Sequence, residues 1–297
     1  MAVSTEPAPV GTVRAHHGEG AVWDAADGTL LWIDILGRCV HRTAPDGTTT
    51  TVGLPDDVGF AVPQEGGGLL VGAGRAVLSV GLPEDGVAQV VDTPAGPVAL
   101  RTNDAGTDPA GRVWFGTMDR AEEEAVGALY RLDGPGRATP VLHDLSVPNG
   151  PVWSPDGTTM YFTDTPTGRI RAYAYDAATG ELGAGRVAVD TQGREGHPDG
   201  MTVDAAGNLW VAFWGGGAVR CFSPEGALLD EIRLPVAQPS RPAWGGPDAR
   251  TLYVTTSRKG LDADALAGQP QAGRLFAVVP GVDGHVPPPA VRLSDDA

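Results

Sequence analysis

The stretch GHPDGMTVDAAGNLWVA, residues 196–212, sets a pattern that recurs along the chain. In its first half Asp199 stands between Pro198 and Gly200, two residues that fix the backbone of a tight turn. A polar turn and a run of bulky residues, 209–212, follow it and predict a short strand. A Pro-Asp-Gly turn on its own indicates only a change of chain direction, so its meaning depends on whether the unit repeats.

Six units of this kind follow one another along the chain. Each combines a turn bearing Asp-Gly or a similar pair with a strand that begins at a large residue and a further strand after it. The units cover residues 20–42, 59–80, 108–132, 149–175, 196–222 and 242–279. A period of roughly 40–50 residues with three or four short strands is typical of a propeller blade. The sequence therefore predicts an all-β fold, a six-bladed β-propeller.

We expect a single domain over residues 1–297, with a short N-terminal tail at about residues 1–9. The ring closes if residues 10–14 or 291–293 supply the outer strand of the last blade, because that pairing covers an open sheet edge. Residues 261–267 are compatible with one turn of helix. A β-sandwich or β-helix is the architectural alternative, but six similar units with a long, irregular period favour radial symmetry.

Composition limits the classes of function. The formal net charge of −16 disfavours nucleic acid and anionic membrane surfaces as partners. No run approaches the ~18 apolar residues of a membrane span, and the N-terminus lacks the basic and apolar regions of a secretory signal. The two cysteines, Cys39 and Cys221, predict free thiols in a reducing compartment. We therefore expect a cytoplasmic protein, a monomer or weak homo-oligomer, that acts on a small molecule.

Polar residues stand at the start of the innermost strand in at least four units, where the loops of a propeller converge on one end of its tunnel. They are Glu19, the run 101–104 (Arg-Thr-Asn-Asp), Asn149 and Asp199. Carboxylate and amide oxygens are the donors that hard cations such as calcium, magnesium and manganese select. An inert, solvated ring of polar loops is the alternative. On ligand chemistry we favour a divalent cation, with Asp199 as both ligand and general base.

Three neighbouring residues are ambiguous. His16 and His17 precede Glu19, but surface histidines at a strand end are the simpler interpretation, since a site containing histidine would favour zinc. Trp214 either packs within its blade, like most of the seven tryptophans, or roofs the pocket.

The polar residues and their surroundings resemble the gluconolactonase, regucalcin and senescence-marker-protein family. The resemblance spans about residues 15–280 and rests on the joint order of motifs that are weak singly. These motifs are Gly18-Glu19-Gly20, Arg101-Thr102-Asn103-Asp104, Trp114-Phe115-Gly116-Thr117-Met118, Pro148-Asn149-Gly150 and Pro198-Asp199-Gly200-Met201. The resemblance implies a propeller that hydrolyses sugar lactones with one divalent cation, calcium foremost, with zinc, manganese or magnesium as alternatives.

The resemblance also implies roles for single residues. Glu19, Asn149 and Asp199 look like the metal ligands, and Asp199 also looks like the general base. Arg101 and Asn103 look like substrate contacts. The family has a further substrate-facing acid just after the Gly-Thr-Met motif; here that run is 119–124, and its register leaves Glu122 and its neighbours open.

Two other functions stay in contention. One is a non-catalytic calcium-binding or scaffold propeller, and the other is a lactonase-like hydrolase of other esters. Arg101, Asn103 and Asp199 together favour an enzyme, because a scaffold has no need of a polar cluster on its axis.

Overall fold

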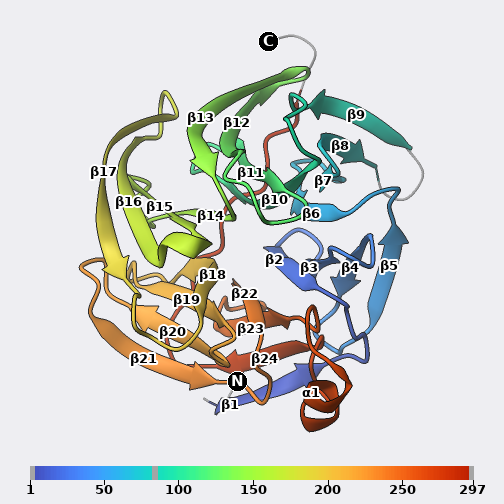
Figure 1. Ribbon diagram of the computed structural model, residues 1–297, viewed down its shortest axis with the longest axis vertical. Coiled ribbons are helices and arrows are strands. Elements are labelled where there is room, and N and C mark those ends of the chain that lie inside the picture. Colours follow the sequence, from blue (N-terminus) through green and yellow to red (C-terminus); the bar gives the residue numbers. More distant parts are fainter. Residues whose placement is uncertain (1–3, 82–85, 294–297) are drawn as a thin grey trace.

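The computed structural model describes residues 4–81 and 86–293. Its strands form six four-stranded sheets, each antiparallel and in hydrogen-bonded order, and the sheets stand around a central axis like the blades of a wheel (Figure 1). The predicted six-bladed β-propeller is therefore confirmed. Both cysteines are free thiols. Among the described residues, no helix is long and apolar enough to cross a membrane.

Five blades are built from consecutive strands that run from the axis to the rim (Figure 1). The first three are β2 (Gly18–Asp24), β3 (Thr29–Asp34), β4 (Cys39–Thr43) and β5 (Thr49–Gly53); β6 (Val58–Pro63), β7 (Leu69–Ala73), β8 (Ala76–Val80) and β9 (Val87–Asp92); β10 (Leu100–Thr107), β11 (Val113–Asp119), β12 (Gly127–Gly134) and β13 (Arg137–Leu145). The next two are β14 (Pro148–Trp153), β15 (Thr159–Asp164), β16 (Arg169–Asp176) and β17 (Glu181–Asp190); β18 (His197–Val203), β19 (Leu209–Trp214), β20 (Ala218–Phe222) and β21 (Leu228–Arg233).

The sixth blade joins the two ends of the chain. It contains β22 (Pro239–Gly245), β23 (Thr251–Thr256) and β24 (Leu275–Val279), and its outer strand is β1 (Ser4–Val10), which pairs antiparallel with β24. Of the two segments considered for closure, the N-terminal one is therefore used, but at residues 4–10 rather than 10–14. Most of the expected tail is this strand, and residues 1–3 lie outside the described ranges. The segment does not look like a strand in sequence because it contains Pro7 and Pro9. Proline is tolerated here because β1 is an edge strand.

The recurring turn has a structural purpose that the repeat alone did not reveal. In the turn before β11, Asp108 accepts hydrogen bonds from the backbone of Arg112 (2.9 Å) and from the indole of Trp114 (3.3 Å). Asp204 repeats this before β19, with the indole of Trp210 at 3.1 Å. Both indoles are buried between sheets. These turn aspartates therefore fasten a blade's second strand to its turn.

The innermost strands carry bulges that set the direction of the axial side chains. The pairing register shifts between Glu19 and Val22 in β2, between Asn149 and Val152 in β14, and between Pro198 and Met201, the segment that contains Asp199, in β18. A bulge bends its strand and re-aims the side chain beside it. This is why an otherwise regular sheet presents polar side chains to the tunnel.

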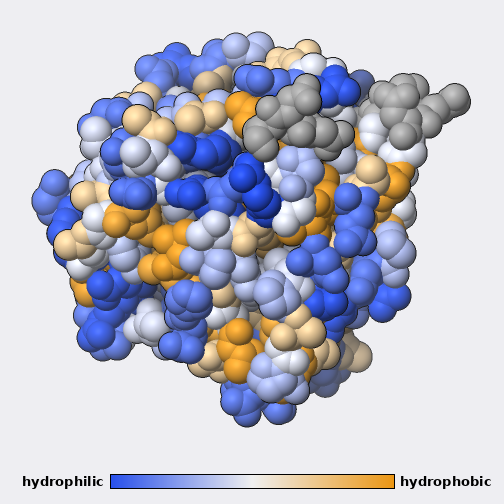
Figure 2. Space-filling model, turned by 90° about the horizontal axis from the view of Figure 1, so that it is seen from above, coloured by the Kyte–Doolittle hydropathy of each residue, from blue (hydrophilic) through white to orange (hydrophobic). Residues whose placement is uncertain are grey.

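The C-terminal segment lies across one end of the ring. Backbone bonds join Ala205 to Asp283 (2.9 Å), Ala290 to Pro63 (2.8 Å) and Val291 to Gly111 (2.9 Å), and the red trace crosses the centre of the ring in Figure 1. The two helical pieces are short, η1 (Thr165–Thr167) and α1 (Ala263–Gly268), the latter close to the predicted turn. In the side view of Figure 2, hydrophobic residues are scattered among hydrophilic ones.

Candidate functional site

All five residues predicted for the site line one cavity of about 360 Å³, at the mouth of the tunnel where the innermost strands begin. They are Glu19 from β2, Arg101 and Asn103 from β10, Asn149 from β14 and Asp199 from β18. The structure thus brings together side chains from four blades that are up to 180 residues apart in sequence. Their neighbours and bonds indicate what the cavity can do.

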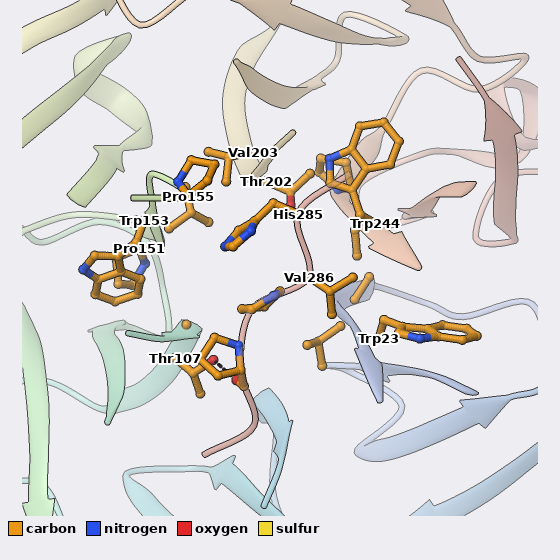
Figure 3. A pocket seen from close by; sticks show the side chains of 18 of the residues that line it. Trp23, Thr107, Pro151, Trp153, Pro155, Thr202, Val203, Trp244, His285 and Val286 are labelled. Carbon is orange, nitrogen blue, oxygen red and sulfur yellow. Dashed lines mark hydrogen bonds between the residues drawn. The ribbon is translucent and has the colours of Figure 1, made fainter. Parts of the chain in front are cut away.

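A second cavity, of about 370 Å³, lies where the same strands end (Figure 3). Its walls include Trp23, Trp153 and Trp244, and the C-terminal segment with His285 and Val286 crosses it. None of the described residues that line it carries a carboxylate. The first, polar cavity therefore contains the carboxylates and all of the predicted site residues.

Glu19 and Asp199 are buried carboxylates that disfavour each other's charge. Burial, followed by the charge of Asp104, raises the pKa of Glu19 to about 8. Burial, followed by the charges of Glu19 and Asp104, raises the pKa of Asp199 well above its usual value. In the described part of the chain neither of them forms an ion pair. A cation between them would remove this penalty.

Asn149 is held by its amide nitrogen, which leaves its oxygen toward the cavity. Its Nδ2 donates to the hydroxyl of Thr165 (2.8 Å), and that hydroxyl donates to the Pro198 carbonyl beside Asp199 (2.8 Å). The Oδ1 atom accepts only a long bond from Asn103 Nδ2 (3.3 Å). Two carboxylates and one amide oxygen on fixed backbones fit a hard divalent cation. In the described ranges no three His, Cys, Asp or Glu side chains form a metal cluster by themselves, so this set depends on Asn149.

Asn103 forms hydrogen bonds both within its own strand, β10, and to β14 of the next blade. Its Oδ1 accepts a hydrogen bond from Arg101 (2.7 Å), and its Nδ2 donates to the Pro148 carbonyl (2.8 Å). Most of its bonding capacity is therefore used within the protein. Burial lowers the pKa of Arg101 and the charge of Glu122 opposes that shift; Arg101 lies 3.7 Å from the Glu122 carboxylate.

Asp104 lies behind the site and faces away from the cavity. Its carboxylate accepts hydrogen bonds from the backbone of Ala105 and Gly150 (both 2.8 Å) and pairs with Arg241 of β22. Both of its oxygens are therefore engaged within the protein. Since Gly150 follows Asn149, the pair instead fixes the backbone of a predicted metal ligand.

The cavity also contains residues that sequence reasoning missed or misplaced. His17 is buried in its wall rather than on the surface, and burial and then the charge of Lys259 hold its pKa well below the usual value. Trp214 does line the cavity, with its ring 5.2 Å from that of His17. Gln238 and Lys259, from the sixth blade, carry no motif and gave no signal. Gln238 Oε1 and His17 Nδ1 are buried without a hydrogen-bond partner in the described structure.

Comparison with known proteins places this arrangement in a family. The family model described as SMP-30/Gluconolactonase/LRE-like region matches residues 17–258. A 6-deoxy-6-sulfogluconolactonase of Pseudomonas putida is 36% identical over 273 residues, 91% of this chain and 94% of that protein. Pentonolactonase XacC of Haloferax volcanii is 38% identical over 270 residues, 87% of this chain and 89% of that protein.

A solved structure agrees over the whole chain. It is described as a calcium-binding protein, regucalcin, from Agrobacterium tumefaciens, with 33% identity, a TM-score of 0.91 and coverage of 99% of this chain and 100% of that one. The match is therefore not confined to the motifs around the cavity. This chain belongs to the SMP-30/gluconolactonase/LRE-like family.

Proposed function

We propose that the protein hydrolyses a sugar lactone to the corresponding aldonic acid, with one divalent cation held by Glu19, Asn149 and Asp199. The observation that carries the proposal is the cavity itself, a space of about 360 Å³ lined by two buried carboxylates, an asparagine and an arginine. Relatives named as lactonases over nearly the full chain length support the reaction class. We infer calcium as the cation, since a structural relative is described as calcium-binding.

The residues can be assigned to the steps of ester hydrolysis. When bound, a divalent cation supplies Lewis-acid polarisation of the lactone carbonyl. Asp199 accepts a proton from the water that attacks the carbonyl carbon, and returns it to the ring oxygen as the ester C–O bond breaks. Arg101, fixed by Asn103, donates N–H bonds that orient the substrate. Trp214 offers an apolar surface to the sugar ring.

The test combines hydrolysis with cation binding. Protein stripped with EDTA is assayed on glucono-1,5-lactone by pH-stat after addition of calcium, magnesium, manganese or zinc. Asp199→Asn should lower kcat by about 100- to 10,000-fold, the usual contribution of a general base. Asp230→Asn, an exposed change on β21, should retain full activity. Calorimetry supplies a readout that does not depend on turnover, and Glu19→Gln should weaken calcium binding.

The outcomes separate the competing functions. Calcium binding without hydrolysis of any lactone would favour the non-catalytic propeller, and hydrolysis only of other esters would favour the lactonase-like alternative. Wild-type rates in Asp199→Asn would contradict the assigned base.

A further inference from the structure

The chain has a single lysine, Lys259, and it lies in the wall of the polar cavity. The other 20 of its 21 Lys and Arg residues are arginines. Its backbone is anchored on both sides, because its N–H donates to the Ser257 hydroxyl (3.0 Å) and its carbonyl accepts from Gln238 (3.1 Å). The backbone of Lys259 is therefore fixed on the loop after β23, and the residue lines the same cavity as Arg101 of β10.

Lys259 and Arg101 share one counter-ion. The carboxylate of Glu122 pairs with Lys259 and lies 3.7 Å from Arg101. Neither cation forms another ion pair within the described residues. Two positive charges against one carboxylate leave an excess positive charge at this part of the cavity, which Glu19 and Asp199 also line.

Glu122 is placed so that a ligand can displace it. It stands in a left-handed conformation, with φ 61°, in the loop between β11 and β12, and its side chain is 35% exposed. The Arg101 side chain, in contrast, is only 6% exposed and cannot turn to solvent for compensation. An anion entering the cavity would meet a fixed guanidinium and an ammonium whose present partner lies at the rim.

We propose that Lys259 and Arg101 bind a negatively charged group on the substrate, at the end of the sugar remote from the lactone carbonyl. The substrate class is thus an anionic lactone, one bearing a sulfonate, phosphate monoester or carboxylate, rather than a neutral aldonolactone. This inference rests on the proposed lactone hydrolysis. The net charge of −16 opposes anions at long range, so recognition must come from such local cations.

The kinetic test uses two lactones that differ only at carbon 6, glucono-1,5-lactone and its 6-phosphate, followed by the 6-sulfo and 6-carboxylate analogues. We expect kcat/KM to be higher for the charged lactones. Lys259→Gln should reduce kcat/KM for them by roughly 10- to 100-fold, the effect of losing a charge-assisted hydrogen bond, and should reduce it by a much smaller factor for the neutral lactone. Lys259→Arg should restore most of the preference, and Glu122→Gln should increase it. Arg169→Gln, which removes an exposed ion pair on β16, is the matched control.

The single lysine permits a test without turnover. Acetylation reaches only Lys259 and the N-terminal amine and abolishes the charge, whereas reductive methylation retains it. Mass spectrometry should show Lys259 protected from acetylation by D-glucitol 6-phosphate and not by D-glucitol, which carries no charge. Equal kcat/KM for charged and neutral lactones, unchanged in Lys259→Gln, would overturn this inference and leave the lactonase intact. Failure to hydrolyse any lactone would overturn the proposed function. Equal protection by the charged and the uncharged polyol would overturn the anion site.

Discussion

At the scale of single residues, Asp104 and Arg241 show how the site is supported from behind. Both side chains are buried: that of Asp104 is 3% exposed and that of Arg241 is 9% exposed. Arg241→Met leaves the Asp104 carboxylate buried without its partner, and loss of one member of a buried pair costs about 3–5 kcal/mol. We therefore expect Arg241→Met to lower the free energy of unfolding by that amount in urea denaturation.

The double variant provides the control for this prediction. Asp104→Asn combined with Arg241→Met removes both charges, so it should be more stable than Arg241→Met alone. A single variant as stable as the wild type would show that the pair does not support the tunnel.

His41 predicts how stability depends on pH. Its ring packs 4.3 Å from that of Trp32, and its Nδ1 lies 2.8 Å from the Thr51 hydroxyl. Burial lowers the pKa of His41, although the charge of Asp34 opposes the shift. The unfolded chain therefore binds this proton more readily, and stability falls as the pH drops through the ordinary histidine value of about 6.5. His41→Gln should show a smaller difference in Tm between pH 7.5 and pH 5.5 than the wild type.

A histidine outside the core tests whether burial is the cause. His143 is exposed on β13, so His143→Gln should leave the difference in Tm unchanged. The same reduction in both variants would contradict the explanation.

Residues that could be found from sequence are those whose backbone is unusual. Glu19, Asn149 and Asp199 each stand beside glycine in a short motif, because a bulge is needed there to aim the side chain. Lys259 and Gln238 reach the cavity from ordinary loop positions of the sixth blade. Their proximity arises from ring closure, which leaves no local trace. His17 was misjudged because nothing in its sequence neighbours indicates that the Trp214 ring covers it.

At the scale of elements, neighbouring inner strands approach so closely that glycine is required between them. A Cβ atom on Gly106 of β10 would lie 2.2 Å from the Pro151 carbonyl oxygen of β14. Gly106→Ala should therefore force two blades apart and lower stability by about 1–3 kcal/mol, the usual effect of overpacking. Because Pro151 follows Asn149 closely, calcium affinity measured by calorimetry should fall as well.

A glycine on the rim is the matched control. A Cβ atom on Gly53, at the end of β5, meets nothing within 4 Å. Gly53→Ala should therefore keep both stability and calcium affinity. Equal effects of the two substitutions would indicate that alanine acts through the unfolded chain and not through the contact with β14.

Element patterns explain why the fold was predictable and one strand was not. The turn aspartates Asp108 and Asp204 each stand six residues before a buried tryptophan, and the repeated hydrogen bond makes the repeat visible in sequence. β1 has neither the turn nor the bulky residues, since it only adds an edge to β24. An element defined by one neighbour and by solvent leaves few constraints on its residues.

At the scale of the whole molecule, the propeller holds its site by joining chain ends. The polar cavity takes residues from the first, third, fourth, fifth and sixth blades, so any loosening of the ring displaces ligands relative to one another. The C-terminal segment braces the opposite end of the tunnel through bonds to Pro63, Gly111 and Ala205. The ring is also closed by the pairing of β1 with β24. Strand β1 can be deleted without changing any site residue.

Removal of residues 1–10 should open the sixth blade. β24 would lose its partner along the register Ala8 with Ala277 to Val10 with Leu275, and an unpaired edge promotes association with other chains. Loss of about 2–3 kcal/mol of strand pairing corresponds to a Tm lower by about 5–10 °C in a domain of this size. Light scattering should show association that increases with protein concentration, and kcat/KM for charged lactones should fall because Lys259 belongs to the opened blade. Removal of residues 1–3 alone keeps β1 and should change none of these quantities. A protein lacking residues 1–10 that stays monomeric with an unchanged Tm would mean that β24 and the C-terminal segment close the ring without β1.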